Sequence, residues 1–142
     1  MRMGTGLYVK NSVKAVALYQ RAFGLTLGYH VLNEDGSYFH SELYRDGVEM
    51  FSVIETGEDR AEDRIVQVSA LLDSEAEVRA AYELLCEGGR VDIPIGPLPW
   101  SPCAASVTDR FGVWWYISAP QHHPAEDYDP TAPWTPDMYK KP

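Results

Sequence analysis

Hydrophobic and polar residues recur along this chain in a pattern that predicts short strands and amphipathic helices. From Val13 to Phe23 apolar residues return every three or four positions, which is the spacing of one face of a helix. Gly24 follows this helix as a candidate C-cap, and Asn11 and Ser12 precede it with oxygens suited to an N-cap. Apolar runs between turn residues predict strands at 7–9, 25–32, 38–44 and 48–54.

The order of one strand, one helix and three strands then returns in the second half of the chain. A charged stretch at 55–64 is interpreted as a linker between the halves. Asn11 aligns with Ser74 and Gly47 aligns with Gly112, at steps of 63 and 65 residues. The second set of strands is predicted at 65–72, 90–95, 104–108 and 113–118, with a helix that Asp73 and Ser74 cap and Gly88-Gly89 ends.

We therefore expect an α+β protein built from two β-α-β-β-β modules, at about 4–54 and 65–118, in a single domain over residues 1–118. A Pro-rich loop is expected at 96–102. The tail at 119–142 holds six of the ten prolines and several aromatic residues, which favours docking on a surface over free disorder. That surface could belong to the same subunit or to a partner.

Composition and charge narrow the choice of partners. The chain has 142 residues, 45% of them hydrophobic, and a net charge of −9. An acidic protein repels phosphate backbones and anionic lipid, so we expect neither nucleic acid nor a membrane as partner, and a neutral or cationic small molecule is easier to accommodate. The first residues lack the apolar stretch of a signal peptide, and Cys86 and Cys103 lack a CxxC spacing, which favours free thiols in a cytoplasmic protein.

Side chains alternate between the two faces of a strand, so apolar positions predict which face packs under the helices. The residues expected on the packed face include Leu7, Phe39, Leu43, Val48, Met50, Val66, Trp115 and Ile117. The other face would line a cleft, with the candidate ligand-binding residues Tyr8, Tyr38, His40, Glu42, Tyr44, Phe51, Gln67, Trp114 and Tyr116, and Trp100 at its mouth. Aromatic walls with an acidic residue suit planar or cationic ligands, although the same rings could fill a collapsed cleft or form a dimer core.

His40 and Glu42 are the candidate catalytic pair, because they stand two apart on one predicted strand and point the same way. Glu42 could simply hold His40 in one tautomer, or the pair could bind a ligand or exchange protons. A catalytic metal needs about three protein ligands, and no third ligand is evident beside them. Cys103 borders the predicted cleft, but no local base or cation would activate its thiol.

Five segments share the pattern of one known family: Leu7–Val9, Ala15–Gly24, His40–Leu43, Glu87–Val91 and Ser106–Val113. They resemble the PhnB-like branch of the vicinal-oxygen-chelate superfamily, which includes glyoxalases, bleomycin-resistance proteins and extradiol dioxygenases. The resemblance covers about residues 7–118. It implies two curled modules side by side, a cleft on the concave face of a mixed sheet, helices on the convex face, and a homodimer.

The same resemblance bears on metal binding. Metal-using relatives carry ligands at positions that align with Gly4, Phe51, Gln67 and Tyr116, and of these only Gln67 could donate to a metal. We therefore expect neither a metal nor another cofactor. Three functions remain open: a binding protein for a small aromatic or cationic molecule, an enzyme that uses a metal or the acid–base pair His40 and Glu42, and a structural protein with a closed cleft.

Overall fold

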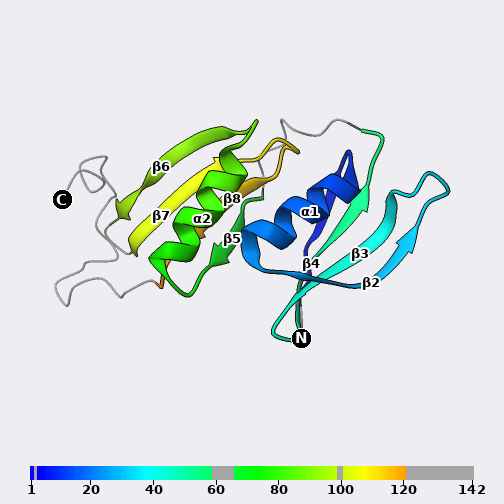
Figure 1. Ribbon diagram of the computed structural model, residues 1–142, viewed down its shortest axis with the longest axis horizontal. Helices are drawn as coiled ribbons and strands as arrows, with labels where there is room; N and C mark the ends of the chain where they lie inside the picture. The colour runs from blue at the N-terminus through cyan, green and yellow to red at the C-terminus, as the bar shows by residue number, and fades with distance from the viewer. Residues whose placement is uncertain (2, 59–65, 99–100, 121–142) are drawn as a thin grey trace.

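The chain folds as two modules with the same order of elements (Figure 1). The structure, a computed structural model, describes residue 1 and residues 3–58, 66–98 and 101–120. The first module consists of β1 (Gly6–Val9), α1 (Ser12–Phe23), β2 (Thr26–Leu32), β3 (Tyr38–Arg45) and β4 (Val48–Glu55). The second consists of β5 (Val68–Leu71), α2 (Glu75–Cys86), β6 (Arg90–Leu98), β7 (Ser101–Thr108) and β8 (Trp114–Ser118).

Each module builds one four-stranded mixed sheet. The strand order is β1-β4-β3-β2 in the first sheet and β5-β8-β7-β6 in the second. The first strand of each module runs parallel to its last strand, and the other neighbours are antiparallel. Figure 1 shows both helices on the same side of the sheets. The α+β class and the duplicated module are thereby confirmed. Within the described ranges, no helix is long and apolar enough to span a membrane.

The hydrophobic core continues from one module into the other through a cluster of aromatic rings. Trp115 of β8 is 1% exposed and packs against Tyr19 and Phe23 of α1, with ring centroids 5.3 Å and 4.9 Å away. Trp115 also meets Phe51 of β4 at 5.6 Å. Aromatic pairs contribute about 0.5–1.5 kcal/mol each beyond the area that they bury. The two modules therefore share one core.

A buried carboxylate lies at this junction. Asp109, in the turn between β7 and β8, is 3% exposed and accepts hydrogen bonds from the Tyr19 hydroxyl and the Trp115 indole, each at 2.8 Å. The backbone N–H groups of Phe111 and Val113 donate to its second oxygen. Burial raises the pKa of Asp109, and the four donated hydrogen bonds oppose that rise. Asp109 thus ties the turn of the second module to the helix of the first.

The two helices begin in different ways. As expected, Ser74 is the N-cap of α2, and its hydroxyl accepts a hydrogen bond from the N–H of Glu77. At α1 the expectation was wrong, because Asn11 has a left-handed backbone and its side chain makes no capping hydrogen bond. The carboxylate of Glu55, at the end of β4, instead accepts from the N–H groups of Asn11 and Ser12 and from the Ser12 hydroxyl.

The two faces of β4 are reversed relative to the expectation. Phe51 and Val53, expected in the cleft, are 6% and 0% exposed, whereas Val48 and Met50, expected to pack, are 53% and 44% exposed. The register between β3 and β4 shifts in this stretch and leaves Met50 without a partner in the ladder. Apolar residues occupy both faces of the strand, so alternation alone could not separate them.

An irregularity at the start of β3 changes the faces of two more residues. The ladder between β2 and β3 passes over Phe39, which was expected to pack and is exposed. Tyr38, expected in the cleft, packs against the core, and its N–H donates to Ser12 Oγ. An extra residue in one strand reverses the alternation that precedes it. Val66, before β5, was also expected to pack and is exposed.

The second and third strands of the second module are longer than expected. β6 continues through Pro94 and Pro97 to Leu98, and β7 begins at Ser101, so most of the predicted loop at 96–102 is strand. Proline has no N–H for a ladder, and it is tolerated here because β6 is the edge strand of its sheet. Trp100 and residues 121–142 of the predicted tail lie outside the described residues.

Candidate functional site

The first sheet has one face that the helices do not cover (Figure 1). Cross-strand pairing places Gly6 of β1, Ser52 of β4 and Glu42 of β3 in one row. Neighbouring strands lie about 4.8 Å apart, so one small molecule can contact all three strands. We name this surface the open face and define it by Gly6, Tyr8, Tyr29, Phe39, His40, Glu42, Tyr44, Ser52 and Ile54.

Glu42 lies between His40 and Tyr44 on the open face. Its Oε1 is 3.6 Å from His40 Nε2, and its Oε2 accepts a hydrogen bond of 3.1 Å from the Tyr44 hydroxyl. The ring of Tyr29 lies beside that of His40, with centroids 6.2 Å apart. The side chain of Glu42 remains 19% exposed. The hydrogen bond from Tyr44 therefore orients the carboxylate, which lies close to His40 and still reaches solvent.

Tyr44 reaches Glu42 because β2 has no side chain beneath the Tyr44 ring. A Cβ atom on Gly28 would lie 2.7 Å from Tyr44 Cδ2, which is closer than real Cβ contacts come. The register between β2 and β3 shifts in the stretch that contains Gly28. Gly28 therefore positions Tyr44. Sequence reasoning missed this residue, although a glycine inside a predicted strand is a signal of close approach.

A cavity of about 670 Å³ opens on this face. Tyr8, Phe39, His40, Ser52 and Ile54 are among the residues that line it. Small-ligand sites have volumes of about 300–1,000 Å³. The residues Tyr8 and Phe39 are 57% and 63% exposed, so their rings present apolar surface to solvent.

The corresponding face of the second sheet is filled by its own side chains. The Gln67 amide and the Trp114 indole both donate to Ser106 Oγ at 3.0 Å, and Ser106 is 2% exposed. Tyr116 lies on β8 opposite Ser69 of β5. Gln67, Trp114 and Tyr116 therefore belong to a different sheet from His40 and Glu42, and none of the three lines the cavity of the open face.

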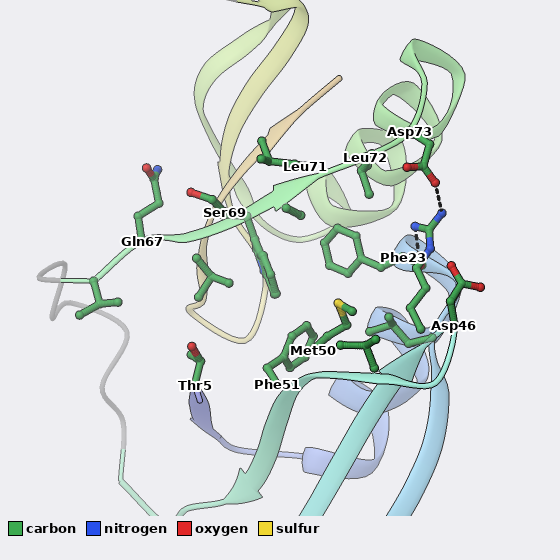
Figure 2. Close-up of a pocket in the computed structure, with 17 residues that line it drawn as sticks. Thr5, Phe23, Asp46, Met50, Phe51, Gln67, Ser69, Leu71, Leu72 and Asp73 are labelled. Atoms are coloured by element: carbon green, nitrogen blue, oxygen red, sulfur yellow. Dashed lines mark hydrogen bonds and ion pairs between the residues drawn. The ribbon is translucent and has the colours of Figure 1, made fainter. Parts of the chain in front are cut away.

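A groove of about 670 Å³ runs between the two modules (Figure 2). Phe51 of the first module and Gln67 of the second both line it. Figure 2 shows Asp73 at one end, where Arg45 closes the groove by donating to Asp73 at 3.0 Å and to Glu77 at 2.8 Å. The walls are mainly apolar, and the ion pairs tie β3 to the start of α2.

The predicted ligand-binding residues thus divide among three places. Four lie on the open face: Tyr8, His40, Glu42 and Tyr44. Three lie on the second sheet: Gln67, Trp114 and Tyr116. Two pack in or against the core: Tyr38 and Phe51. The open face also contains residues that alternation did not assign to it, Phe39 and Ile54, because the register shifts in β3 and β4 cannot be derived from the spacing.

Ligating and nucleophilic groups are sparse. In the part of the chain that the structure describes, no three His, Cys, Asp or Glu side chains form a group that could hold a metal ion. The described cysteines, Cys86 and Cys103, are both free. Cys103 is fully buried in β7, and burial raises the pKa of its thiol, which disfavours the reactive thiolate.

Solved structures of other proteins share this fold. Protein PA1353 from Pseudomonas aeruginosa is 23% identical, the match covers 86% of this chain and 99% of that one, and the TM-score is 0.72. The PhnB protein from Bacillus cereus is 18% identical, with 84% and 100% covered and a TM-score of 0.71. The fosfomycin resistance protein FosX from Listeria monocytogenes, solved with Mn(II) and sulfate, is 16% identical, with 84% and 89% covered and a TM-score of 0.62.

The search of curated proteins gives no match. The family model of the Glyoxalase/Bleomycin resistance protein/Dioxygenase superfamily, in contrast, matches residues 4–117, which include both modules. The chain therefore belongs to the glyoxalase/bleomycin resistance protein/dioxygenase superfamily.

Proposed function

We propose that this protein binds a small aromatic or cationic molecule on the open face, and that it does so without a resident metal. The observation that carries the proposal is the carboxylate of Glu42, which a hydrogen bond from Tyr44 orients beside His40 and next to the small residues Gly6 and Ser52. A protein with a net charge of −9 attracts cations and repels anions over most of its surface.

The side chains around Glu42 suit a flat ligand that carries a positive charge. The exposed rings of Tyr8, Tyr29 and Phe39 offer stacking and cation–π contacts, each about 0.5–1 kcal/mol at an exposed site. Glu42 would add a charge-assisted hydrogen bond, which is roughly twice as strong as a neutral one. The ring contacts select for shape, and the carboxylate selects for charge.

Calorimetric titration with a matched pair of probes tests this binding. We expect the aromatic cation benzamidine to bind and its uncharged isostere benzamide to bind much more weakly. Glu42→Gln should weaken benzamidine binding about tenfold, because it removes one charge-assisted contact. Glu83→Gln, on the exposed surface of α2, removes the same charge and should change nothing. Equal affinities of the wild type and the Glu42→Gln variant would contradict the proposal.

Acid–base catalysis at the same face is a second candidate, which the 3.6 Å approach of His40 to Glu42 favours. A base must lie within hydrogen-bond reach of the proton that it removes, and the carboxylate can orient the imidazole for this step. In D₂O a working base would introduce deuterium into bound ligands, which nuclear magnetic resonance detects. Loss of that exchange in His40→Gln, with ligand affinity retained, would support catalysis. Absence of exchange in the wild type would argue against catalysis and favour binding as the function of the open face.

The proposal that no metal is bound rests on the side chains at the positions where metal-using relatives carry their ligands. Of the positions that align with the family's metal ligands, Gly4 has no side chain, Phe51 is buried in the core, and the Gln67 amide is bonded to Ser106. We expect elemental analysis of protein purified without chelator or affinity tag to find far less than one metal ion per chain. Near-stoichiometric zinc, nickel, iron or manganese would overturn this part.

We also propose that two copies of the chain associate through the exposed rings of the open face, so that a ligand bound beside Glu42 would lie between the two copies. Exposed apolar rings in a contiguous patch mark interaction surfaces, and Tyr8, Tyr29 and Phe39 are each more than half exposed. Sedimentation equilibrium should give the mass of a dimer for the wild type and of a monomer for Phe39→Asp. A dimer that binds none of the probes would instead favour a structural protein. The observation that supports this alternative is on the second sheet, where the Gln67 and Trp114 side chains bond to Ser106.

A further inference from the structure

Another cavity, of about 530 Å³, lies where the turn between β1 and α1 meets the turn between β7 and β8. It brings residues near position 10 next to residues near position 110. We propose that this cavity binds a small organic anion, namely a carboxylate or phosphate ester with an apolar body. This cavity shares Tyr8 with the open face, but its argument does not depend on the function proposed there.

The charge of the lining residues is opposite to that of the whole chain. Of the residues that the structure describes, Lys10, Lys14 and Arg110 line the cavity, against one carboxylate, that of Glu58. The chain as a whole carries a net charge of −9, so a local excess of cations runs against its composition. Over residues 3–58, 66–98 and 101–120, none of these three cations makes an ion pair.

Glu55 and Asp109, two carboxylates that the structure places near this cavity, are already engaged. Glu55 accepts the N–H groups of Asn11 and Ser12, so the start of α1 is capped by the protein itself and is not the anion site. Asp109 is buried and accepts hydrogen bonds from Tyr19 and Trp115 on the inner side of its turn. Among the described residues, neither Glu55 nor Asp109 is therefore available to pair with the three cations, and Glu58 is the carboxylate that lines the cavity beside them.

Apolar side chains supply the second half of the site. Phe111 and Val113 line the same cavity, and the guanidinium carbon of Arg110 lies 5.0 Å from the centroid of the Phe111 ring. This stacking fixes the guanidinium and leaves its N–H groups free to bind oxygens in its plane. A ligand with a flat body could lie against Phe111 and Val113 while its anionic end reaches the three cations.

Titration calorimetry of the full chain at low salt tests the proposal. The probes are phenyl phosphate, benzoate, inorganic phosphate and the uncharged benzamide. We expect phenyl phosphate and benzoate to bind, inorganic phosphate to bind more weakly, and benzamide not to bind in this cavity. Affinity should fall as salt is added, because exposed cations are screened. Arg110→Gln and Lys14→Gln should each weaken phenyl phosphate binding about tenfold, the effect of losing one charge-assisted hydrogen bond.

Two variants separate this site from general charge effects and from the open face. Arg79→Gln removes a positive charge from the exposed surface of α2 and should leave phenyl phosphate binding unchanged. Glu42→Gln should also leave it unchanged, whereas Arg110→Gln should leave benzamidine binding unchanged. Tyr8 lines both cavities and is therefore not a discriminating position. Equal losses in Arg110→Gln and Arg79→Gln, or no binding of either organic anion by correctly folded wild type, would overturn the proposal.

Discussion

At the scale of single residues, some contacts of the open face could be predicted from the sequence and others could not. His40, Glu42 and Tyr44 alternate on one strand, and the structure places all three on the same face. Tyr38 continues this alternation in the sequence, yet it packs against the core because the ladder passes over the next residue. Alternation therefore locates a face only within a regular stretch of strand.

Gly28 gives the sharpest test at this scale. Gly28→Ala should push the Tyr44 ring away, because the new Cβ would overlap the ring. The hydrogen bond from Tyr44 to Glu42 would be lost, and benzamidine affinity on the open face should fall about fivefold, which corresponds to a loss of about 1 kcal/mol. Calorimetric titration measures this change.

Gly96→Ala is the matched control for that substitution. Gly96 lies in β6, a Cβ there would meet no atom within 4 Å, and its backbone needs no positive φ. Alanine costs less backbone entropy than glycine in a strand, so Gly96→Ala should leave the protein equally or slightly more stable, with unchanged ligand affinity. A similar loss of affinity in both variants would show that Gly28 has no special role.

At the scale of elements, the sequence predicts both helices and the order of all strands, because helix spacing and turn residues are local signals. The α2 cap could also be predicted, since Ser74 and Glu77 are three residues apart. The α1 cap could not, because Glu55 lies 44 residues from Asn11 and meets it only through the parallel pairing of β1 with β4. The buried and exposed faces of β4 could not be predicted for a similar reason. They depend on how β4 pairs with β3, and not on the residues of β4 alone.

The two caps can be compared by removing each of them. Glu55→Ala should lower the free energy of unfolding by about 1–2 kcal/mol and Ser74→Ala by about 1 kcal/mol, because Glu55 accepts three hydrogen bonds and Ser74 accepts one. Hydrogen exchange of the first-turn amides should quicken in α1 for Glu55→Ala and in α2 for Ser74→Ala. Faster exchange in both helices for either variant would argue against separate caps.

At the scale of the whole molecule, the duplication could be predicted from the constant offset between equivalent residues, but the junction of the modules could not. The shared aromatic core and the Asp109 carboxylate connect residues 90 positions apart. Contacts between residues so far apart in the sequence leave no local pattern from which they could be predicted. The same holds for the cation-lined cavity, which joins two turns from different modules.

The Asp109 junction gives stability a definite dependence on pH. The folded-state pKa of Asp109 lies above that of the unfolded chain, about 3.9. The contribution of Asp109 to the free energy of unfolding is therefore fully present below about pH 4, and it decreases as the pH rises through the folded-state pKa. We expect Asp109→Asn to lower the free energy of unfolding by about 1–3 kcal/mol, because two donors lose their acceptor. Urea unfolding between pH 4 and 7 should show this difference shrinking as the pH rises.

Asp35→Asn provides a control with the opposite sign. Hydrogen bonds from Ser37 lower the pKa of Asp35 in the folded protein, so its contribution is present above the unfolded-state pKa and is lost as the pH falls. The difference between the wild type and Asp35→Asn should therefore grow as the pH rises. A pH-independent difference for Asp109→Asn would mean that the buried carboxylate keeps its charge over the whole range.

The prolines of β6 have a consequence for how the protein avoids aggregation. An edge strand with free N–H and C=O groups can recruit a strand from another chain. Pro94 and Pro97 remove N–H groups from the outer edge of the second sheet, and the irregular register of β2 disturbs the outer edge of the first. The inner edges belong to β1 and β5, which have only four residues each. None of the four edges is therefore a long, regular template for a foreign strand.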